Sequence, residues 1–289
     1  MEKLLKTIKE KMQHLSKRQK LIAQFLIDHY DKAAFMTAAR LGKAVGVSES
    51  TVVRFSKDLG FAGYPHLQKM LQELIKGKLT AVQRMEVSST RINESNILKS
   101  ILQSDIDKIR VTLAEMDKDN FNNIVKLILS ARRIYILGVR SSAVLASFMS
   151  FYFNLIFDNV RLIQTTSVSE MFEQILRVAE DDVVIGITFP RYSQRTVKAM
   201  QFTKNQGAQC IAITDSSQSP IVPFADKVLY ARSDMASFAD SLVAPLSVIN
   251  ALIVAIGMNR TSHLYQTLES LEAIWDEYNV YEKADNNSE

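Results

Sequence analysis

Residues 183–188, with the sequence Val-Val-Ile-Gly-Ile-Thr, form a short apolar run rich in β-branched residues, which is typical of a buried β-strand. Four similar runs occur at residues 134–137, 160–163, 210–214 and 228–230. Amphipathic segments at residues 142–157, 168–178 and 193–206 separate these runs. Apolar strands that alternate with helices indicate a parallel sheet covered on both faces. We therefore predict an α/β domain with a five-stranded parallel sheet flanked by helices.

The rest of the chain has the apolar spacing of helices. Residues 1–76 show it throughout, with breaks at Gly46, Gly60, residues 63–65 and Gly77, and it returns over residues 97–130. Two closing helices are expected at residues 237–258 and 262–281. The predicted fold class is α plus α/β, with a helical domain at residues 1–77, a linker and connecting helix at 78–107, an α/β domain at 108–284 and a tail at 285–289.

Positive charge is concentrated in the helical part. The 289 residues have a formal net charge of +4, but residues 1–80 contain 15 Lys or Arg and only 7 Asp or Glu, a net charge of +8. Lysine and arginine supply most non-specific affinity for nucleic acids because they neutralise phosphates. The excess fits either a nucleic-acid-binding module or an ordinary solvated helical surface, and charge alone does not separate the two.

The composition argues against a membrane protein and against a disulfide scaffold. The apolar stretch at residues 242–257 is shorter and more polar than the ~20 apolar residues of a membrane-spanning helix. Residues 1–11 lack the apolar core of a secretion signal. Cys210 has no second cysteine for a disulfide or a thiolate metal site, so we expect it to be a small buried residue. These features predict a cytoplasmic protein without a membrane partner.

A tight corner between two helices is predicted within residues 37–55. Gly42 is small where the helices must approach closely, and Gly46 can adopt a positive φ at the turn. Ser48 is a suitable N-cap for the second helix. On that helix Val52 and Phe55, followed by Leu59, are expected to face the core.

This arrangement leaves the polar residues of the second helix turned outward. The first residues of such a helix contact base edges in the major groove of DNA, where arginine can bind guanine with two hydrogen bonds. Arg54 is the leading candidate for reading a base, and Lys57 for contacting a phosphate. The alternative is an ordinary helical hairpin. The candidate DNA-binding residues are Ser48, Ser50, Thr51, Arg54 and Lys57.

Two loops of the α/β part combine hydroxyl groups with a guanidinium group. They are residues 137–142, Leu-Gly-Val-Arg-Ser-Ser, and residues 188–196, Thr-Phe-Pro-Arg-Tyr-Ser-Gln-Arg-Thr. Ligands of parallel α/β sheets bind beyond the carboxyl ends of the strands, where the amino termini of helices attract anions. An anionic small molecule is therefore expected here. Alternatively, Ser142 and Ser193 only cap helices and the arginines are solvated.

The sequence resembles a known family in both parts. Residues 45–55, Val-Gly-Val-Ser-Glu-Ser-Thr-Val-Val-Arg-Phe, followed by Leu-Gly-Phe-Ala-Gly-Tyr at 59–64, resemble the DNA-binding domain of RpiR-type bacterial transcriptional regulators. That family usually has alanine where this chain has Gly42. The order of elements, Gly138 with Ser141 and Ser142, the segment Ile-Ala-Ile-Thr-Asp-Ser at 211–216 and Phe-Ala-Asp at 224–226 resemble the sugar isomerase (SIS) domain.

The resemblance implies that the second domain senses a phosphosugar and that the protein forms a homodimer or tetramer. This sequence departs from the family pattern at two places. Residues 188–193 replace the usual Ser-x-Ser-Gly-x-Thr loop, and Arg140 replaces a small residue. Two arginines fit a more acidic sugar ligand, or one with its anion placed differently. The candidate effector-binding residues are Gly138, Arg140, Ser141, Ser142, Thr188, Arg191 and Ser193.

These observations favour a regulator of carbohydrate metabolism genes over an enzyme. Glu170 and Glu173 are the candidates for the general base of a phosphosugar isomerase, the main alternative, but they fit a solvated first helical turn equally well. No motif predicts a metal ion or a nucleotide cofactor, and we expect neither. Two further alternatives remain open: a helical domain that binds a protein, and a DNA-binding protein without an effector.

Overall fold

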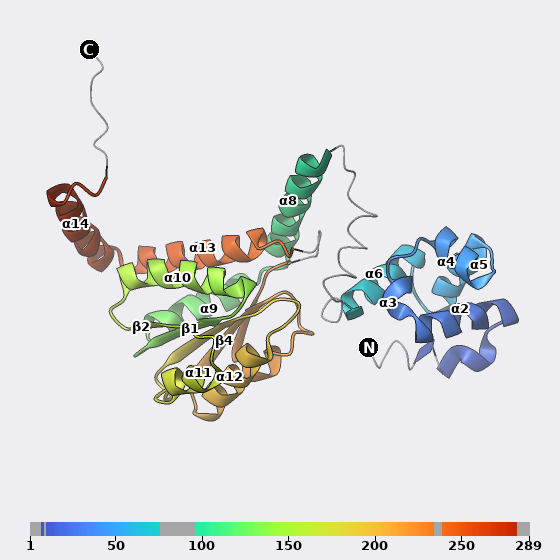
Figure 1. The fold of residues 1–289 in the computed structure, drawn as a ribbon, viewed down its shortest axis with the longest axis horizontal. Helices are drawn as coiled ribbons and strands as arrows, with labels where there is room; N and C mark the ends of the chain where they lie inside the picture. Colours follow the sequence, from blue (N-terminus) through green and yellow to red (C-terminus); the bar gives the residue numbers. More distant parts are fainter. Residues whose placement is uncertain (1–6, 9, 76–95, 234–238, 282–289) are drawn as a thin grey trace, which may run out of the picture. The chain divides into compact units, whose positions relative to one another are not determined.

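The computed structural model describes residues 7–8, 10–75, 96–233 and 239–281 (Figure 1). They divide into two compact units, an N-terminal unit that includes residues 10–75 and a C-terminal unit that includes residues 96–233 and 240–281. Each unit is described by itself. Most of the predicted linker and all of the predicted tail lie outside the described residues.

The N-terminal unit is helical, as predicted. A capping box opens its first long helix, in which the Ser16 and Gln19 side chains each accept a hydrogen bond from the backbone N–H of the other residue. The side chains of Ile22, Leu26, Leu41, Phe55 and Leu67 are fully buried and come from five different turns of these helices. The elements are η1 (Met12–His14), α2 (Lys17–Asp28), α3 (Tyr30–Ala33), α4 (Ala38–Val45), α5 (Glu49–Asp58) and α6 (Tyr64–Ile75).

The C-terminal unit contains a five-stranded parallel sheet in the order β2-β1-β3-β4-β5, which confirms the predicted fold class. All five strands lie within one residue of their predicted positions. They are β1 (Ile134–Gly138), β2 (Val160–Ile163), β3 (Val183–Ile187), β4 (Gln209–Thr214) and β5 (Lys227–Tyr230). Strands β1 and β3 are buried along their whole length, as continuous apolar runs require.

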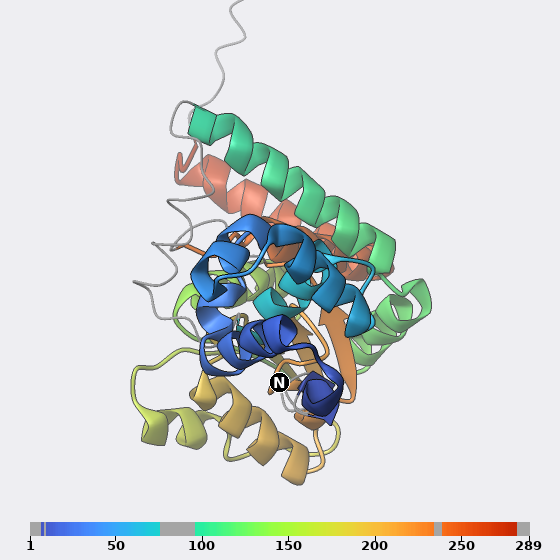
Figure 2. The ribbon, with the colours of Figure 1, turned by 90° about the vertical axis from the view of Figure 1, so that its right-hand side faces the viewer.

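Helices cover both faces of the sheet. One apolar core joins the sheet to α9, α10 and α13, and a second joins its other face to α11 and α12. Figure 1 shows these two helical layers on opposite sides of the strands, and in Figure 2 α11 and α12 lie at the bottom of the C-terminal unit and α8 at its top. The helices are α8 (Ile97–Glu115), α9 (Lys118–Leu129), α10 (Ser141–Ile156), α11 (Val168–Ile175), α12 (Gln194–Asn205), α13 (Val243–Asn259) and α14 (Thr261–Glu277), with the short η3 (Val222–Phe224) before β5.

The structure differs from the sequence-based expectations at some helix ends. The helical region at 97–130 is two helices, because the Asp117 side chain accepts hydrogen bonds from the N–H groups of Asp119 and Asn120 and starts α9. Helix α8 continues across the predicted domain boundary at residue 107. Helix α13 begins at Val243, later than predicted, and Pro245 lies in its first turn, where proline is tolerated.

Two predictions about apolar segments can be compared with the structure. Cys210 is buried in β4, and burial raises the pKa of its thiol. Among the described helices, no single one is long and apolar enough to cross a membrane, although α13 and α14 together pass that test as a pair bent by 99°.

Candidate functional sites

The corner between α4 and α5 has the predicted geometry. Gly46 ends α4 in the left-handed region, with φ 73°, and the N–H groups of Gly46 and Val47 both donate to the Gly42 carbonyl. A Cβ atom on Gly42 would lie 2.7 Å from the Val47 carbonyl oxygen, which explains why a small residue is needed there. The Ser48 hydroxyl caps α5 by accepting a hydrogen bond from the Thr51 N–H.

Helix α5 has one buried and one exposed face. Val52 and Phe55 are fully buried, and Leu59 just after the helix is 7% exposed. Ser50, Arg54 and Lys57 are exposed, and Arg54 makes no hydrogen bond or ion pair with other described residues. Arg54 and Lys57 therefore present two positive charges to solvent, in the orientation that the sequence predicted.

The predicted outward orientation of Thr51 is wrong. Its side chain is only 5% exposed, and its hydroxyl oxygen lies 2.8 Å from the Ser48 hydroxyl oxygen. Thr51 is four residues before Phe55, so the two side chains lie on the same face of α5. Ser48 also contacts the exposed Ser50 hydroxyl at 3.0 Å. Thr51 thus supports the N-cap from inside and is not part of the exposed surface.

Further polar groups at this corner were missed from the sequence. Arg40 and Lys43 on α4 are exposed and add positive charge next to the corner. At the other end of α5, Asp58 accepts a hydrogen bond from the Gln19 side chain at 2.5 Å, and the Lys11 ammonium group donates to the Asp58 carbonyl at 2.8 Å. These bonds fix α5 against α2 and the N-terminal segment. Pairing across 39 and 47 residues has no local sequence signal.

In the C-terminal unit, the two predicted ligand loops follow adjacent strands. Gly138 of β1 pairs with Ile187 of β3 at the carboxyl end of the sheet. Helix α10 leaves β1 toward one face of the sheet, and α12 leaves β3 toward the other. A sheet in this order has its topological switch point between these strands, which is where ligands of open α/β sheets bind.

The first loop brings the start of α10 close to β1. A Cβ atom on Gly138 would lie 2.5 Å from the Ser142 carbonyl oxygen, so only glycine permits this approach. Arg140 occupies the N-cap position with φ 58° and makes no side-chain cap bond. Its side chain and that of Ser141 are exposed, whereas Ser142 is 5% exposed. Ser142 is therefore not the cap of α10.

The second loop is held by hydrogen bonds to its own ends. Thr188 is 2% exposed, and its hydroxyl oxygen accepts a hydrogen bond from the Ser193 N–H at 3.2 Å. Ser193 is the N-cap residue of α12, but its hydroxyl makes no cap bond. The Arg191 side chain is exposed.

Sequence reasoning missed a link between this loop and the next one. The Tyr192 hydroxyl donates to the carboxylate of Asp215, a 2% exposed residue that follows β4, at 2.9 Å. Beside it, the Thr214 hydroxyl donates to the Ser219 hydroxyl at 2.7 Å. The position of Asp215 directly after an apolar strand run was the available signal.

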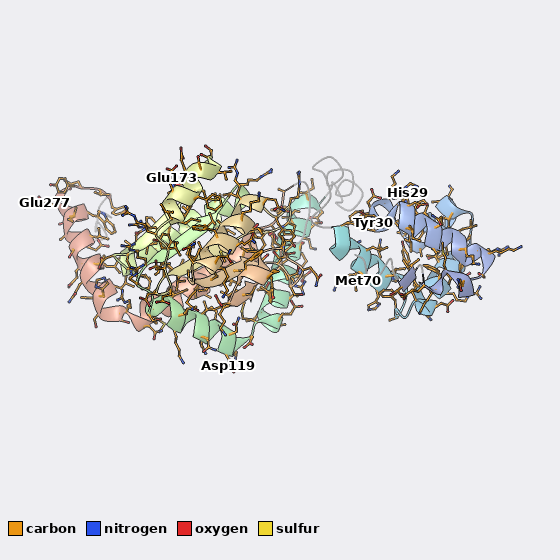
Figure 3. All side chains as sticks on the ribbon, turned by 90° about the horizontal axis from the view of Figure 1, so that it is seen from below. His29, Tyr30, Met70, Asp119, Glu173 and Glu277 are labelled. Atoms are coloured by element: carbon orange, nitrogen blue, oxygen red, sulfur yellow. The ribbon has the colours of Figure 1, made fainter. Side chains whose placement is uncertain are left out.

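Both candidate general bases are exposed. Glu170 is exposed and accepts a hydrogen bond from the Thr165 hydroxyl within its own loop. Glu173 is exposed on the outer side of α11 (Figure 3). Among the described residues, no group of three His, Cys, Asp or Glu side chains could hold a metal ion. A separate cavity of about 360 Å³ between α8, α9 and α13 is mainly apolar, and none of the predicted effector residues lines it.

Comparisons with known proteins match both units. The helix-turn-helix domain of the rpiR family matches residues 2–78, and the SIS domain matches residues 127–255. The HTH-type transcriptional regulator HexR of Escherichia coli is 24% identical over 280 residues, which cover 93% of each chain. An uncharacterized HTH-type transcriptional regulator of Caldanaerobacter subterraneus is 23% identical over 95% of this chain and 97% of its own length.

Solved structures show the same fold. The sugar isomerase domain of an RpiR transcription factor from Sphaerobacter thermophilus has a TM-score of 0.58 and 24% identity, covering 60% of this chain and 97% of that one. The Vibrio vulnificus NanR protein complexed with ManNAc-6P has a TM-score of 0.55 and 18% identity, covering 94% and 97%. With an rpiR-type helix-turn-helix domain followed by a SIS domain, the chain belongs to the RpiR-type transcriptional regulators.

Proposed function

We propose that this protein is a cytoplasmic transcriptional regulator that binds double-stranded DNA through α5 and senses a phosphosugar or another anionic sugar metabolite at the β1–β3 edge. The observation that carries the proposal is the exposed face of α5, with Ser50, Arg54 and Lys57 on a corner fixed by Gly46. This face belongs to the segment with a net charge of +8. The predicted domain boundaries at residues 77 and 284 are part of the proposal, whereas α8 spans residue 107 and is assigned whole to the C-terminal domain.

The candidate residues on α5 and at its N-cap have different roles in the proposed DNA binding. Arg54 contacts a base, preferably guanine, because its guanidinium can donate two hydrogen bonds to one base edge. Ser50 contacts a base or a nearby phosphate, and Lys57 contacts a phosphate. Ser48 caps the helix, and Thr51 supports that cap. A short recognition helix reads few bases, so a two-fold dimer reads two half-sites about 10 base pairs, or a multiple, apart.

The effector site uses the groups that end β1 and β3. The Ser141, Ser142, Thr188 and Ser193 hydroxyls and the N–H groups at the start of α10 suit a phosphate, since a helix amino terminus favours an anion. The complex of NanR with ManNAc-6P, a relative with the same fold, supports a phosphosugar. Gly138 permits the close approach of the loop to the strand. Arg140 and Arg191 add two cations, which favour a ligand with a second acidic group.

A salt titration tests the DNA-binding part. The affinity of the full-length protein for a duplex is measured by fluorescence anisotropy at several salt concentrations. If the protein contacts phosphates, the logarithm of the binding constant should fall linearly with the logarithm of the salt concentration, with a slope of about −0.9 for each phosphate neutralised. Arg54→Ala is expected to weaken binding at least ~10-fold, as loss of a base contact worth about 1–3 kcal/mol implies. Lys69→Ala removes an exposed charge of α6 as the control and should have a small effect. No binding at low salt would refute this part of the proposal.

Two open-chain ligands that differ in one group test the effector class. 6-Phosphogluconate has a carboxylate where glucitol 6-phosphate has a hydroxymethyl group. Thermal unfolding should show greater stabilisation by 6-phosphogluconate, because ligand binding to the folded state raises its stability. Arg140→Gln and Arg191→Gln together should remove the difference between the two ligands while keeping the effect of the phosphate. Equal stabilisation of the wild type by both ligands would contradict a second acidic group.

We propose that the protein regulates without isomerising its ligand. The exposed positions of Glu170 and Glu173 support this view, since both carboxylates face solvent. Incubation with phosphosugars and analysis of the products tests it. Turnover that disappears in Glu170→Gln or Glu173→Gln would support the isomerase instead.

A further inference from the structure

Helix α8, the first element of the C-terminal unit, has little apolar burial. It is 19 residues long and lies wholly within the described part of the chain, and its only buried residues are the polar Lys108 and Thr112. Leu102 and Ile106 are 54% and 44% exposed. Figure 1 shows the first turns of α8 extending beyond the other helices of the unit. A helix with so little apolar burial shifts or opens at a lower free-energy cost than a core helix.

The space beside α8 is incompletely filled. The mainly apolar cavity of about 360 Å³ lies between α8, α9 and α13, and Ile109 and Leu113 line it on the α8 side. Side chains that border a cavity lack packing partners on that side. Helix α8 can therefore slide relative to α9 and α13 without compressing a packed core, as helices do in shear motions.

Polar contacts fix α8 to the segment that follows β5. The Arg232 guanidinium group donates to both carboxylate oxygens of Glu115, at 2.9 Å from its Nε, and the Arg232 N–H donates to the Thr112 hydroxyl oxygen at 2.9 Å. The Ser241 hydroxyl donates to the Asp105 carboxylate at 2.6 Å. Hydrogen bonds weaken steeply when their geometry changes, so these contacts define one position of α8.

The segment that holds α8 begins at the effector edge of the sheet. The Ala231 N–H donates to the Thr214 carbonyl at 2.8 Å, at the carboxyl ends of β5 and β4. The next residue after β4, Asp215, accepts the hydrogen bond of Tyr192 in the second candidate effector loop. Hydrogen bonds between neighbouring residues therefore connect that loop, through the ends of β4 and β5, to Arg232 and α8.

We propose that α8 has two positions whose populations depend on the effector, and that Glu115 and Asp105 are the positioning residues that hold it in the position described here. This inference rests on the proposed function, because it requires an effector at the β1–β3 edge and a DNA-binding N-terminal unit. The effector shifts the two populations by its differential affinity for them. Because α8 begins the C-terminal unit, its displacement moves the point at which the chain joins the N-terminal unit.

The effect of the ligand on DNA affinity tests this coupling. The affinity of the full-length protein for a duplex that it has selected is measured with and without 6-phosphogluconate. Glu115→Gln is expected to reduce the change in affinity from at least ~10-fold to below ~3-fold, while 6-phosphogluconate still stabilises the protein against heat. Asp107→Asn is the matched control, because it breaks an exposed ion pair with Arg110 on the same helix. It should leave the change at the wild-type value.

A charge exchange separates a specific contact from general damage. Glu115→Arg alone should abolish the coupling, since it places two guanidinium groups together. Glu115→Arg combined with Arg232→Glu should restore most of it, because the pair is present again with its charges reversed. Circular dichroism and the melting temperature show whether each variant is folded. Ser241→Ala removes the hydrogen bond to Asp105 and replaces Glu115→Gln if that variant does not fold.

Hydrogen exchange followed by mass spectrometry tests the inference without a ligand. The amides of α8 should exchange at least about threefold faster in Glu115→Gln than in the wild type, with α10 unchanged, because the lost contact fixes α8 alone. Equal exchange of α8 in both proteins would overturn the inference, and so would an undiminished effect of 6-phosphogluconate on DNA binding by folded Glu115→Gln. Failure of 6-phosphogluconate to stabilise the wild type would instead refute the proposed effector class, and the exchange comparison would still decide the inference.

Discussion

Thr51 and Arg54 lie three residues apart on α5, yet one is buried and the other is exposed. The sequence predicted the core positions of this helix correctly, because Val52, Phe55 and Leu59 follow the helical period. It misplaced Thr51, whose hydroxyl satisfies its hydrogen bond inside the unit with Ser48. A polar residue at the edge of the apolar face of a helix can point toward the core or toward solvent. It points toward the core when a hydrogen-bond partner is available there, as Ser48 is for Thr51.

Thr51→Val tests this assignment at the scale of one hydroxyl group. Valine keeps the shape of threonine but loses the bond to Ser48, so the free energy of unfolding should fall by about 1 kcal/mol in chemical denaturation. The affinity for a duplex should change less than about twofold, since Thr51 makes no DNA contact in our account. Ser50→Ala is the matched control and should weaken DNA binding without loss of stability. Weaker DNA binding by Thr51→Val at unchanged stability would return Thr51 to the contact surface.

At the scale of elements, the strands were the most predictable feature. Residues such as 183–188 are readily predicted as strands, because short runs of β-branched apolar residues between polar segments favour buried strands. The order of the strands was not available from periodicity, and it is the order that places the Gly138 loop beside the Thr188 loop. The Tyr192–Asp215 bond also depends on that order. Most of the candidate effector site could thus be named, but its arrangement could not be derived.

The corner between α4 and α5 gives a prediction about backbone conformation. Gly46 has φ 73°, and a Cβ atom added to it would have no neighbouring atom within 4 Å, so a side chain there meets strain but no clash. Gly46→Ala should lower the free energy of unfolding of the N-terminal unit by about 1–2 kcal/mol, the cost of the left-handed conformation. Gly46→Asn should cost less, because asparagine tolerates this region better. Chemical denaturation followed by circular dichroism measures both, and equal costs would refute the strain argument.

The start of β5 gives a prediction about acid stability. Burial raises the pKa of the Asp226 carboxyl, but hydrogen bonds from the Lys204 ammonium group and the Cys210 N–H lower it, and the net pKa is below the usual 3.8. The ionised carboxylate therefore stabilises the fold at pH values above about 4, and this contribution is lost as the pH falls through the lower folded pKa. Asp226→Asn should be less stable than the wild type at pH 7. Denaturation curves at several pH values should show that the difference in free energy of unfolding between the wild type and Asp226→Asn shrinks below about pH 4. A difference that does not change with pH would show that it does not come from the charge of Asp226.

At the scale of the whole molecule, the proposed regulation depends on how an effector changes the spacing of two α5 helices in a dimer. Helix α10 begins at the candidate effector loop and packs against β1 and α13. A ligand that prefers one dimer geometry shifts the population toward that geometry by its differential affinity. The spacing of two α5 helices would change with it. The sequence predicted the candidate effector loop at the start of α10 but not the packing of α10 against α13, because the two helices lie far apart in the sequence.

The most direct test of the account measures the affinity for DNA with and without an effector. A duplex is first selected from a random pool by the full-length protein, and its affinity is then measured at constant salt in the presence and absence of 6-phosphogluconate. The account predicts at least a ~10-fold change for the wild type, which corresponds to about 1.4 kcal/mol of coupling, and no change when Arg140→Gln, Ser142→Ala and Arg191→Gln are combined. An equal affinity with and without a ligand that demonstrably stabilises the protein would contradict the central claim.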